Sequence, residues 1–108
     1  MIVRHWKGIA KTQEADHLYS SPDESYIPRI IKIDGFIRAS ILRRTVPLGV
    51  EFLILTLWDS MEAIQAFAGT QVNEAVVPLE VQVMMIEYDK EVSHYEVTMD
   101  YLSERENR

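Results

Sequence analysis

The stretch from Val50 to Trp58 constrains the fold more than any other part of this sequence, because it is apolar in both alternating registers. A strand in a sheet with one wet face alternates apolar and polar residues, since successive side chains point to opposite faces. One register here holds Phe52, Ile54, Thr56 and Trp58, and the other holds Leu53, Leu55 and Leu57. Both faces of this strand therefore need a cover.

The helices of so short a chain can cover only one face of its sheet, so the face with Leu53, Leu55 and Leu57 needs another partner. Leaving it wet would forgo about 1.5–3 kcal/mol per leucine, and contiguous apolar patches usually mark interfaces. Two-fold homodimers are the commonest assembly. We therefore expect a second copy of the chain on this face; the alternative is a cover formed by the tail or a long loop of the same chain.

Length and charge narrow the functional classes. The chain has 108 residues, which suits one domain, predicted over residues 1–99, with a polar tail over residues 100–108. Its net charge of -6 argues against a nucleic-acid partner, which requires Lys and Arg against phosphates. No block of like charges points to a membrane surface. The sequence has no cysteine, which excludes disulfides, zinc–thiolate sites and cysteine nucleophiles.

The N-terminal residues and the longest apolar stretch indicate the cellular compartment to expect. Residues 1–6 carry charge inside their apolar run and do not resemble a signal peptide. The longest apolar stretch, Phe52 to Leu57, is far too short to span a bilayer. We expect a cytoplasmic protein with no membrane partner.

Periodicity predicts the element order β-α-β-β-α-β. The predicted strands are rich in β-branched and aromatic residues and cover Ile2–Ala10, Phe36–Thr45, Val50–Trp58 and Val92–Met99. Val46 to Gly49 form a turn that makes the middle strands a hairpin. This order predicts the ferredoxin-like plait, an α+β fold with helices on one face of an antiparallel sheet. Right-handed crossovers put the first and third strands at its centre.

Caps and helix breakers place the helices. The first predicted helix starts at Gln13, is capped by Thr12 and turns Ala15 and Leu18 inward, and the second covers Pro22–Ile33, with a capping box at Ser21 and Glu24, a kink at Pro28 and a stop at Gly35. The third helix is capped by Asp59 with Glu62, ends at Gly69 and turns Ala63, Ile64 and Phe67 inward. The fourth is an irregular helix over Asn73–Met85 around Pro78.

The three histidines are not expected to form a metal site. His5, His17 and His94 lie on the first strand, the first helix and the last strand. No pair has the i, i+4 helical spacing of a metal site, and no acidic neighbour completes a ligand set. A hydrogen-bonded or surface histidine is the commoner role of each. No Ser-His-Asp order, phosphate loop or dinucleotide fingerprint is present.

Aromatic and basic residues on the strands are the candidates for a ligand pocket. Trp58 shares a register with Phe52 and Thr56, and Trp6 lies on the neighbouring first strand. Small-molecule pockets are mainly apolar and aromatic with a few polar groups, although a hydrophobic core is the commoner use of a large aromatic. Arg4, if it points inward, must meet a carboxylate or an anionic ligand, because an unpaired buried charge is very costly.

The run EFLILTLWDSMEAIQAF, from Glu51 to Phe67, resembles the strand-to-helix segment of antibiotic biosynthesis monooxygenase domains. Ile33-Asp34-Gly35-Phe36 resembles their x-P-G-F entry to the second strand, with Asp34 in place of proline. Val92 to Val97, with His94-Tyr95-Glu96, resembles the closing strand of an uncharacterised branch. The likeness covers residues 2 to 97 and implies a dimeric α+β barrel.

The resemblance also implies a functional class. The family includes cofactor-independent oxygenases of polycyclic aromatic substrates and haem-degrading enzymes, and in both a tryptophan at the Trp58 position lines the pocket. The haem-degrading branch uses a histidine on the following helix, where this chain has Val76 and Val77 and no histidine from residue 59 to 93. It also has an asparagine on the first strand, where this chain reads His5-Trp6-Lys7. The resemblance therefore implies an enzyme without a cofactor.

These observations give one leading hypothesis and two alternatives. The first is a cofactor-independent monooxygenase of a small aromatic or quinol-like metabolite, in which Trp58 packs the ring and His94 or His5 acts as the base. The second is a non-catalytic homodimer that binds a small molecule or has a regulatory role. The third is haem binding or degradation.

Overall fold

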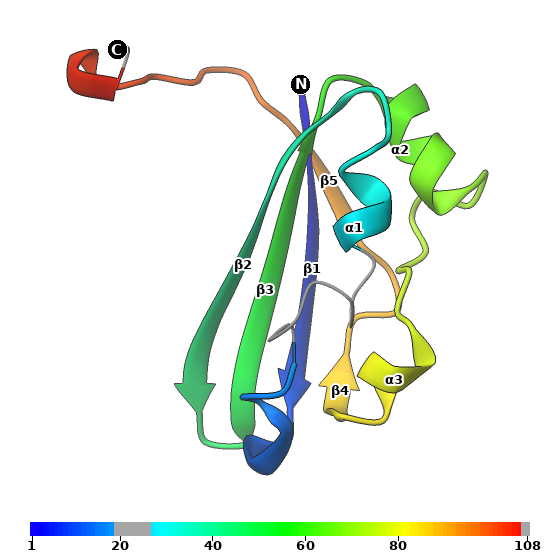
Figure 1. Ribbon diagram of the computed structural model, residues 1–108, viewed down its shortest axis with the longest axis vertical. Coiled ribbons are helices and arrows are strands. Elements are labelled where there is room, and N and C mark those ends of the chain that lie inside the picture. The colour runs from blue at the N-terminus through cyan, green and yellow to red at the C-terminus, as the bar shows by residue number, and fades with distance from the viewer. Residues whose placement is uncertain (19–26, 107–108) are drawn as a thin grey trace.

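An antiparallel sheet forms the framework of the protein (Figure 1). The structure, a computed structural model, describes residues 1–18 and 27–106. In these residues the sheet has five strands, β1 (Ile2–Ala10), β2 (Phe36–Val46), β3 (Gly49–Trp58), β4 (Met85–Tyr88) and β5 (Ser93–Glu96). They are ordered β2-β3-β1-β4. β5 also pairs with β1, on the same edge as β4. The first and third strands lie at the centre, as predicted.

The register fixes which residues share a face. β1 runs antiparallel to β3 from Ile2 opposite Trp58 to Ala10 opposite Val50. β2 and β3 form the predicted hairpin. β4 pairs with the second half of β1 and β5 with the first half. The α+β plait with an antiparallel sheet is therefore confirmed.

The helices are shorter than the sequence predicts. They are α1 (Ile27–Ile30), α2 (Met61–Ala68) and α3 (Leu79–Gln82), with 3-10 turns at Thr12–Glu14 and Glu104–Glu106. The helix predicted from Gln13 is one 3-10 turn, in which Lys11, not Thr12, occupies the cap position. Ala15 and Leu18 are nevertheless buried, as expected.

The second predicted helix, Pro22–Ile33, is only partly within the described residues. Its capping box at Ser21 and Glu24 lies outside them. Pro28 falls in α1, which ends at Ile30 rather than Ile33. Gly35 forms the turn into β2 with a φ of 94°. A Cβ there would lie 2.5 Å from Asp59 Oδ1 and 2.6 Å from Ala63 Cβ, so both space and backbone favour glycine.

The cap of α2 differs by one residue from the prediction. Ser60 is the N-cap, and its hydroxyl accepts a hydrogen bond of 3.2 Å from the Ala63 N–H. Asp59 instead donates its backbone N–H to the Gly35 carbonyl at 2.8 Å, which ties the end of β3 to the start of β2. Gly69 ends the helix with a φ of 81°, as predicted.

The prediction of an irregular helix over Asn73–Met85 was wrong at the end of that segment. Only Leu79–Gln82 is helical, and β4 begins at Met85. The strand was missed because it has only four residues, too few for a period-two pattern to stand out. The last strand is also shorter than Val92–Met99, since it ends at Glu96.

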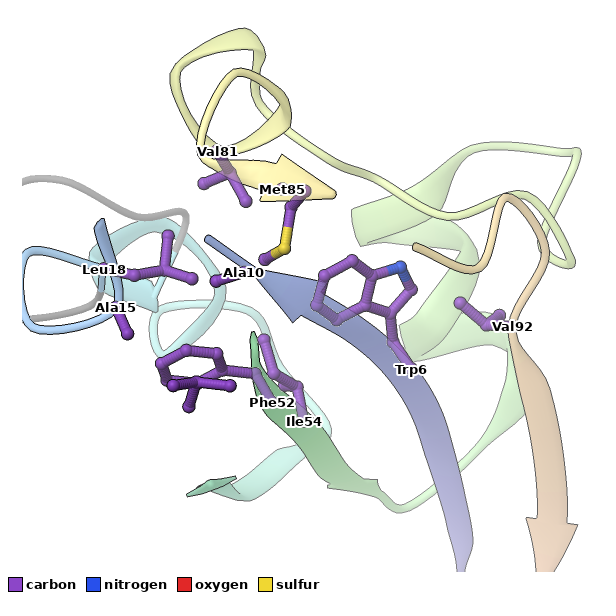
Figure 2. Close-up of a cluster of buried hydrophobic side chains, with 10 residues drawn as sticks. Trp6, Ala10, Ala15, Leu18, Phe52, Ile54, Val81, Met85 and Val92 are labelled. Carbon is purple, nitrogen blue, oxygen red and sulfur yellow. The ribbon is translucent and has the colours of Figure 1, made fainter. Parts of the chain in front are cut away.

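Helices and loops cover one face of the sheet, called the inner face. Its main cluster joins alternate residues of β1 and β3 to the segments on either side (Figure 2): Trp6, Ala10, Ala15, Leu18, Val50, Phe52, Ile54, Val81, Met85 and Val92. A second cluster holds Ile30, Trp58, Ala63 and Ile64. The predicted inward register of β3 is therefore confirmed.

The opposite, outer face of the sheet is only half covered in one subunit. Leu53 and Leu55 are partly exposed, and their β2 neighbour Leu42 is 47% exposed. Leu57 differs from the expectation, because it is 7% exposed in the single chain. Val3 and Arg38 are its partners in the sheet and flank it on both sides.

Candidate functional site

Arg4 and His94 form the centre of the candidate site. The two residues are opposite one another on β1 and β5 and project to the inner face. The Arg4 Nη1 lies 3.0 Å from His94 Nε2. The guanidinium also donates to the Val72 carbonyl at 2.5 Å and to the Glu74 carbonyl at 2.9 Å. Arg4 is 5% exposed, so these contacts hold a buried cation.

Two of the hydrogen bonds of Arg4 go to backbone carbonyls, a kind of partner that the sequence expectation of a carboxylate or an anionic ligand did not include. Backbone carbonyls from the segment after α2 accept its hydrogen bonds, and its Cζ lies 5.6 Å from the centre of the Phe67 ring. Arginine stays protonated under all ordinary conditions. Carbonyl dipoles and an aromatic face therefore contribute to the solvation of the charge, and Arg4 ties the segment at residues 72–74 to the sheet.

The contact with Arg4 fixes the protonation of His94. A guanidinium only donates hydrogen bonds, so Nε2 must accept, and the neutral ring carries its proton on Nδ1. Burial lowers the pKa of His94 below its ordinary value of 6.5, and the positive charge of Arg4 lowers it further. At neutral pH this histidine is therefore an uncharged hydrogen-bond donor whose lone pair is engaged.

His94 opens onto a surface hollow of about 380 Å³, the His94 hollow, which is lined by Met1, Ile2, Asp59, Met61, His94, Tyr95 and Glu96. Its volume lies at the lower end of small-molecule pockets, which span about 300–1,000 Å³. Thioether and aliphatic groups provide the apolar wall, while the imidazole of His94 and the carboxyl groups of Asp59 and Glu96 can orient a ligand. The hollow suits a molecule of one or two rings.

Trp58 and its neighbours pack in the core beside this site and do not line the hollow. Trp58 is 0% exposed and donates from Nε1 to Thr56 Oγ1 at 2.8 Å. Its ring stacks on Phe67 at 5.9 Å and meets Phe36 edge-on at 5.3 Å. Since Phe67 also lies under Arg4, one continuous set of contacts connects Trp58 with the Arg4–His94 pair.

Four of the residues predicted to bind substrate are packed into the core of the single chain. Their exposed fractions are 0% for Trp58, 5% for Trp6, 4% for Thr56 and 2% for Phe52. The Trp6 indole N–H donates to the Asp89 carbonyl at 2.8 Å. The Trp58 indole N–H donates to the Thr56 hydroxyl. In the single chain these four side chains, three aromatic rings and the Thr56 hydroxyl, are therefore part of the hydrophobic core.

The two histidines predicted as catalytic lie on opposite faces of the sheet. His94 is on the inner face, and His5 is on the outer face, where its ring meets Tyr95 edge-on at 6.2 Å. Adjacent residues of one strand point in opposite directions, so Arg4 and His5 cannot serve one site. In the described residues no group of three or more histidine and acidic side chains could hold a metal ion.

Several residues of the site were absent from the sequence-based list. Val72 and Glu74 contact Arg4 through their backbone carbonyls, and because every residue has one, the sequence gives no signal for these contacts. Phe67 was identified only as an inward residue of its helix. Asp59 and Met61 follow β3 directly, and the end of a strand beside a helix start is the signal that could have identified them.

Comparisons with known proteins agree with this geometry at the level of the fold. No protein-family model and no curated protein matches the sequence significantly. Solved structures do match. A Bacillus cereus protein assigned as an antibiotic biosynthesis monooxygenase is 18% identical with a TM-score of 0.63, over 94% of this chain and 97% of that chain.

The second group of matches is MhuD, the heme-degrader of Mycobacterium tuberculosis. A variant with two manganese protoporphyrin IX per active site is 18% identical with a TM-score of 0.66, over 95% of this chain and all of that chain. A form with two hemes bound is 19% identical with a TM-score of 0.55. None of the helices in the described residues is long and apolar enough to cross a membrane. The chain shares the fold of antibiotic biosynthesis monooxygenase-type proteins, as its sequence resemblance implies.

Proposed function

We propose that this protein binds a small electron-rich aromatic molecule, of the phenol or hydroquinone class, in the His94 hollow and oxygenates it without a cofactor. The observation that carries the proposal is the Arg4–His94 pair, a buried cation joined to an uncharged histidine on the wall of that hollow. The fold shared with an assigned monooxygenase supports the reaction class.

The pair suits stabilisation of a phenolate. The Nδ1–H of His94 can donate to a ligand oxygen, and the nearby charge of Arg4 favours the ionised form of that ligand. The carboxyl groups of Asp59 and Glu96 line the same hollow and can pass the released proton to water. His94 acts here as the donor that holds the anion, rather than as the base, because its lone pair is engaged by Arg4.

An ionised hydroquinone supplies the electrons for the reaction. One oxygen atom of O2 enters the ring and the other leaves as water, so that hydroquinone and O2 give hydroxyquinone and water. The protein contributes binding, orientation and stabilisation of the anion, which are the main resources of a site without a redox group.

Oxygen uptake with a panel of hydroquinones tests the proposal. We expect uptake above the rate of spontaneous oxidation, and a loss of about tenfold to hundredfold in kcat/KM for His94→Gln. His5→Gln is the matched control, because it changes a histidine on the same sheet but on the other face. Equal rates for buffer, wild type and both variants would sink the oxygenase assignment.

A non-catalytic binding protein is the second candidate. The observation that favours it is the complete burial of Trp58, which leaves the hollow without an indole wall. A ligand retained through purification and seen by native mass spectrometry, with no product formed in air, would select this alternative.

The residues of the hollow do not fit haem. MhuD binds two hemes, but the only histidine on this hollow, His94, directs its lone pair to Arg4 rather than outward. A volume of about 380 Å³ is also too small to enclose a porphyrin. Hemin titration should therefore give no specific Soret shift, and a saturable shift at one equivalent would contradict this.

We also propose that the functional unit is a homodimer in the cytoplasm, joined through the outer faces of the two sheets. The support is the half-exposed apolar surface around Leu42, Leu53 and Leu55, which a two-fold partner could cover with its own copy. Sedimentation equilibrium at micromolar concentration tests it. Particles of 12.5 kDa alone would contradict the proposal.

A further inference from the structure

The His94 hollow carries acidic groups at one end and its histidine at the other. Glu96, Ile2 and Trp58 lie in one row across β5, β1 and β3, and Asp59 follows Trp58 at the end of the sheet where the chain begins (Figure 1). His94 lies on the same face of β5 as Glu96, two residues and about 7 Å further along the strand. The two carboxyl groups are therefore at the rim, and the imidazole is further inside.

Both acidic side chains are accessible to a ligand. Asp59 and Glu96 are exposed residues that line the hollow. In the part of the chain that the structure describes, the ion pairs join other residues, and neither of these carboxyl groups takes part in one. The N-terminal ammonium belongs to Met1, which lines the same hollow, and it forms no ion pair within these residues either. Two carboxyl groups against one ammonium leave the rim with a net negative charge.

The inner end of the hollow has the opposite character. Arg4 Nη1 lies 3.0 Å from His94 Nε2, so His94 presents its Nδ1–H to the hollow with a buried cation behind it. This arrangement favours a ligand oxygen that carries negative charge. Ile2 and Met61 add apolar wall. The hollow is thus complementary to a ligand with an acidic hydroxyl at one end of an apolar body and a cation at the other.

An anionic substituent fits this arrangement poorly. A phenol that bears a carboxylate arm and places its hydroxyl on His94 would bring the carboxylate toward Asp59 and Glu96, and like charges repel. The net charge of -6 acts in the same sense at longer range, because it attracts cationic molecules and repels anionic ones. Local and long-range electrostatics therefore both favour an amine over an acid.

We propose that the His94 hollow selects phenols and hydroquinones that carry an ammonium group on a short alkyl arm, with the hydroxyl on the His94 Nδ1–H and the ammonium beside Glu96 and Asp59. The proposal rests on the function proposed above and names the substrate class of the same site. A separation of about 7 Å between His94 and Glu96 along β5 suits one ring with a two-carbon arm.

Three phenols of similar size test the charge preference without any turnover. Tyramine has a cationic arm, para-ethylphenol a neutral arm and para-hydroxyphenylacetate an anionic arm. NMR titration of each, followed on the ring protons of His94, reports binding in this hollow. We expect tyramine to bind about fivefold more tightly than para-ethylphenol, as two ion pairs of the strength found at protein surfaces allow, and the anion to bind most weakly. Equal constants, tighter binding of the anion, or no response of His94 to any of the three would overturn the proposal.

Variants assign the preference to the two carboxyl groups. Glu96→Gln and Asp59→Asn should each reduce the affinity ratio of tyramine to para-ethylphenol by about twofold, and the double variant should abolish the preference. Glu62→Gln is the matched control, because it removes the same charge from an exposed residue of α2 that does not line the hollow. Its ratio should equal that of wild type. A ratio that falls equally in all three single variants would overturn the assigned contact.

Oxygen uptake separates this proposal from the oxygenase assignment. The same three arms are compared on a hydroquinone ring, and we expect kcat/KM to be highest for the aminoethyl compound. Similar kcat/KM values for all three would overturn the substrate preference and leave the oxygenase assignment intact. Preferential binding of tyramine at His94, with no hydroquinone consumed above its spontaneous rate, would overturn the oxygenase assignment and support the amine preference.

Discussion

Replacing Arg4 by methionine removes the guanidinium but keeps most of the length of the side chain. The Val72 and Glu74 carbonyls and the His94 Nε2 then lose their donor. An unsatisfied buried acceptor costs about 1–3 kcal/mol, but all three groups are only partly buried, and removal of a desolvated charge offsets part of the loss. We expect a net destabilisation of about 2–3 kcal/mol, a large share of the roughly 5–15 kcal/mol that holds a domain folded.

Arg4→Lys is the matched control for this prediction. An ammonium keeps the positive charge, but it cannot bridge two carbonyls and an imidazole as a planar guanidinium does. Its destabilisation should therefore be smaller, about 1–2 kcal/mol. Urea unfolding followed by the fluorescence of the two buried tryptophans measures both variants, and equal slopes with respect to urea would show that only stability changed.

The charge effect has a second readout in the titration of His94. Arg4→Met removes one of the two causes that lower the pKa of His94, so the pKa should rise, although burial still holds it below the ordinary value. In Arg4→Lys it should change little. NMR titration of the ring protons measures this directly. A free energy of unfolding within about 0.5 kcal/mol of wild type, or a His94 titration that does not respond to Arg4→Met, would refute the role assigned to Arg4.

Four further predictions follow from single contacts. The pKa of His94 in the folded protein is below the unfolded value of 6.5, so the unfolded chain binds more protons than the folded chain just below pH 6.5. The free energy of unfolding should therefore fall as the pH drops below 6.5 and stay level above it. A flat pH profile in the wild type, or the same fall in His94→Gln, would contradict this prediction. Gly35→Ala should destabilise by more than 1 kcal/mol in urea unfolding, since its φ is 94° and its Cβ would meet Asp59. Trp58→Phe should cost about 1–3 kcal/mol in the same assay, because it leaves a cavity and removes the donor to the buried Thr56 hydroxyl. Leu55→Arg should weaken the dimer by at least tenfold in sedimentation without unfolding the subunit, and an unchanged dimer would exclude the outer face as the interface.

The strands were the predictable part of this fold. The bounds of β1 and the register of β3 follow from β-branched composition and strict alternation, which are properties of single residues and their neighbours. The helix starts were less predictable, because Asp59 and Ser60 are both good caps, and it is the Ser60 hydroxyl that accepts the Ala63 N–H while Asp59 is held by the Gly35 carbonyl. β4 could not be recognised from four residues.

The candidate site was predictable only in its charged members. Arg4 and His94 were identified from the strands that carry them, and their pairing follows once the register of β1 and β5 is known. What the sequence could not reveal is that the acceptors of Arg4 are backbone carbonyls, since every residue has one. The position of those carbonyls depends on the loop after Gly69, and thus on tertiary structure.

Alternation along β1 has a consequence for any experiment on this protein. Arg4 projects to the inner face and reaches His94, while His5 projects to the outer face and reaches Tyr95. The ligand site and the proposed dimer surface therefore share β1 but use side chains on its opposite faces, and Tyr95, which lines the His94 hollow and contacts His5, lies between them. Because they are separated by the thickness of one sheet, outer-face variants such as Leu55→Arg should leave the His94 titration unchanged. If they shift it, the two faces are energetically coupled, and the site must be studied in the assembled dimer rather than in a single subunit.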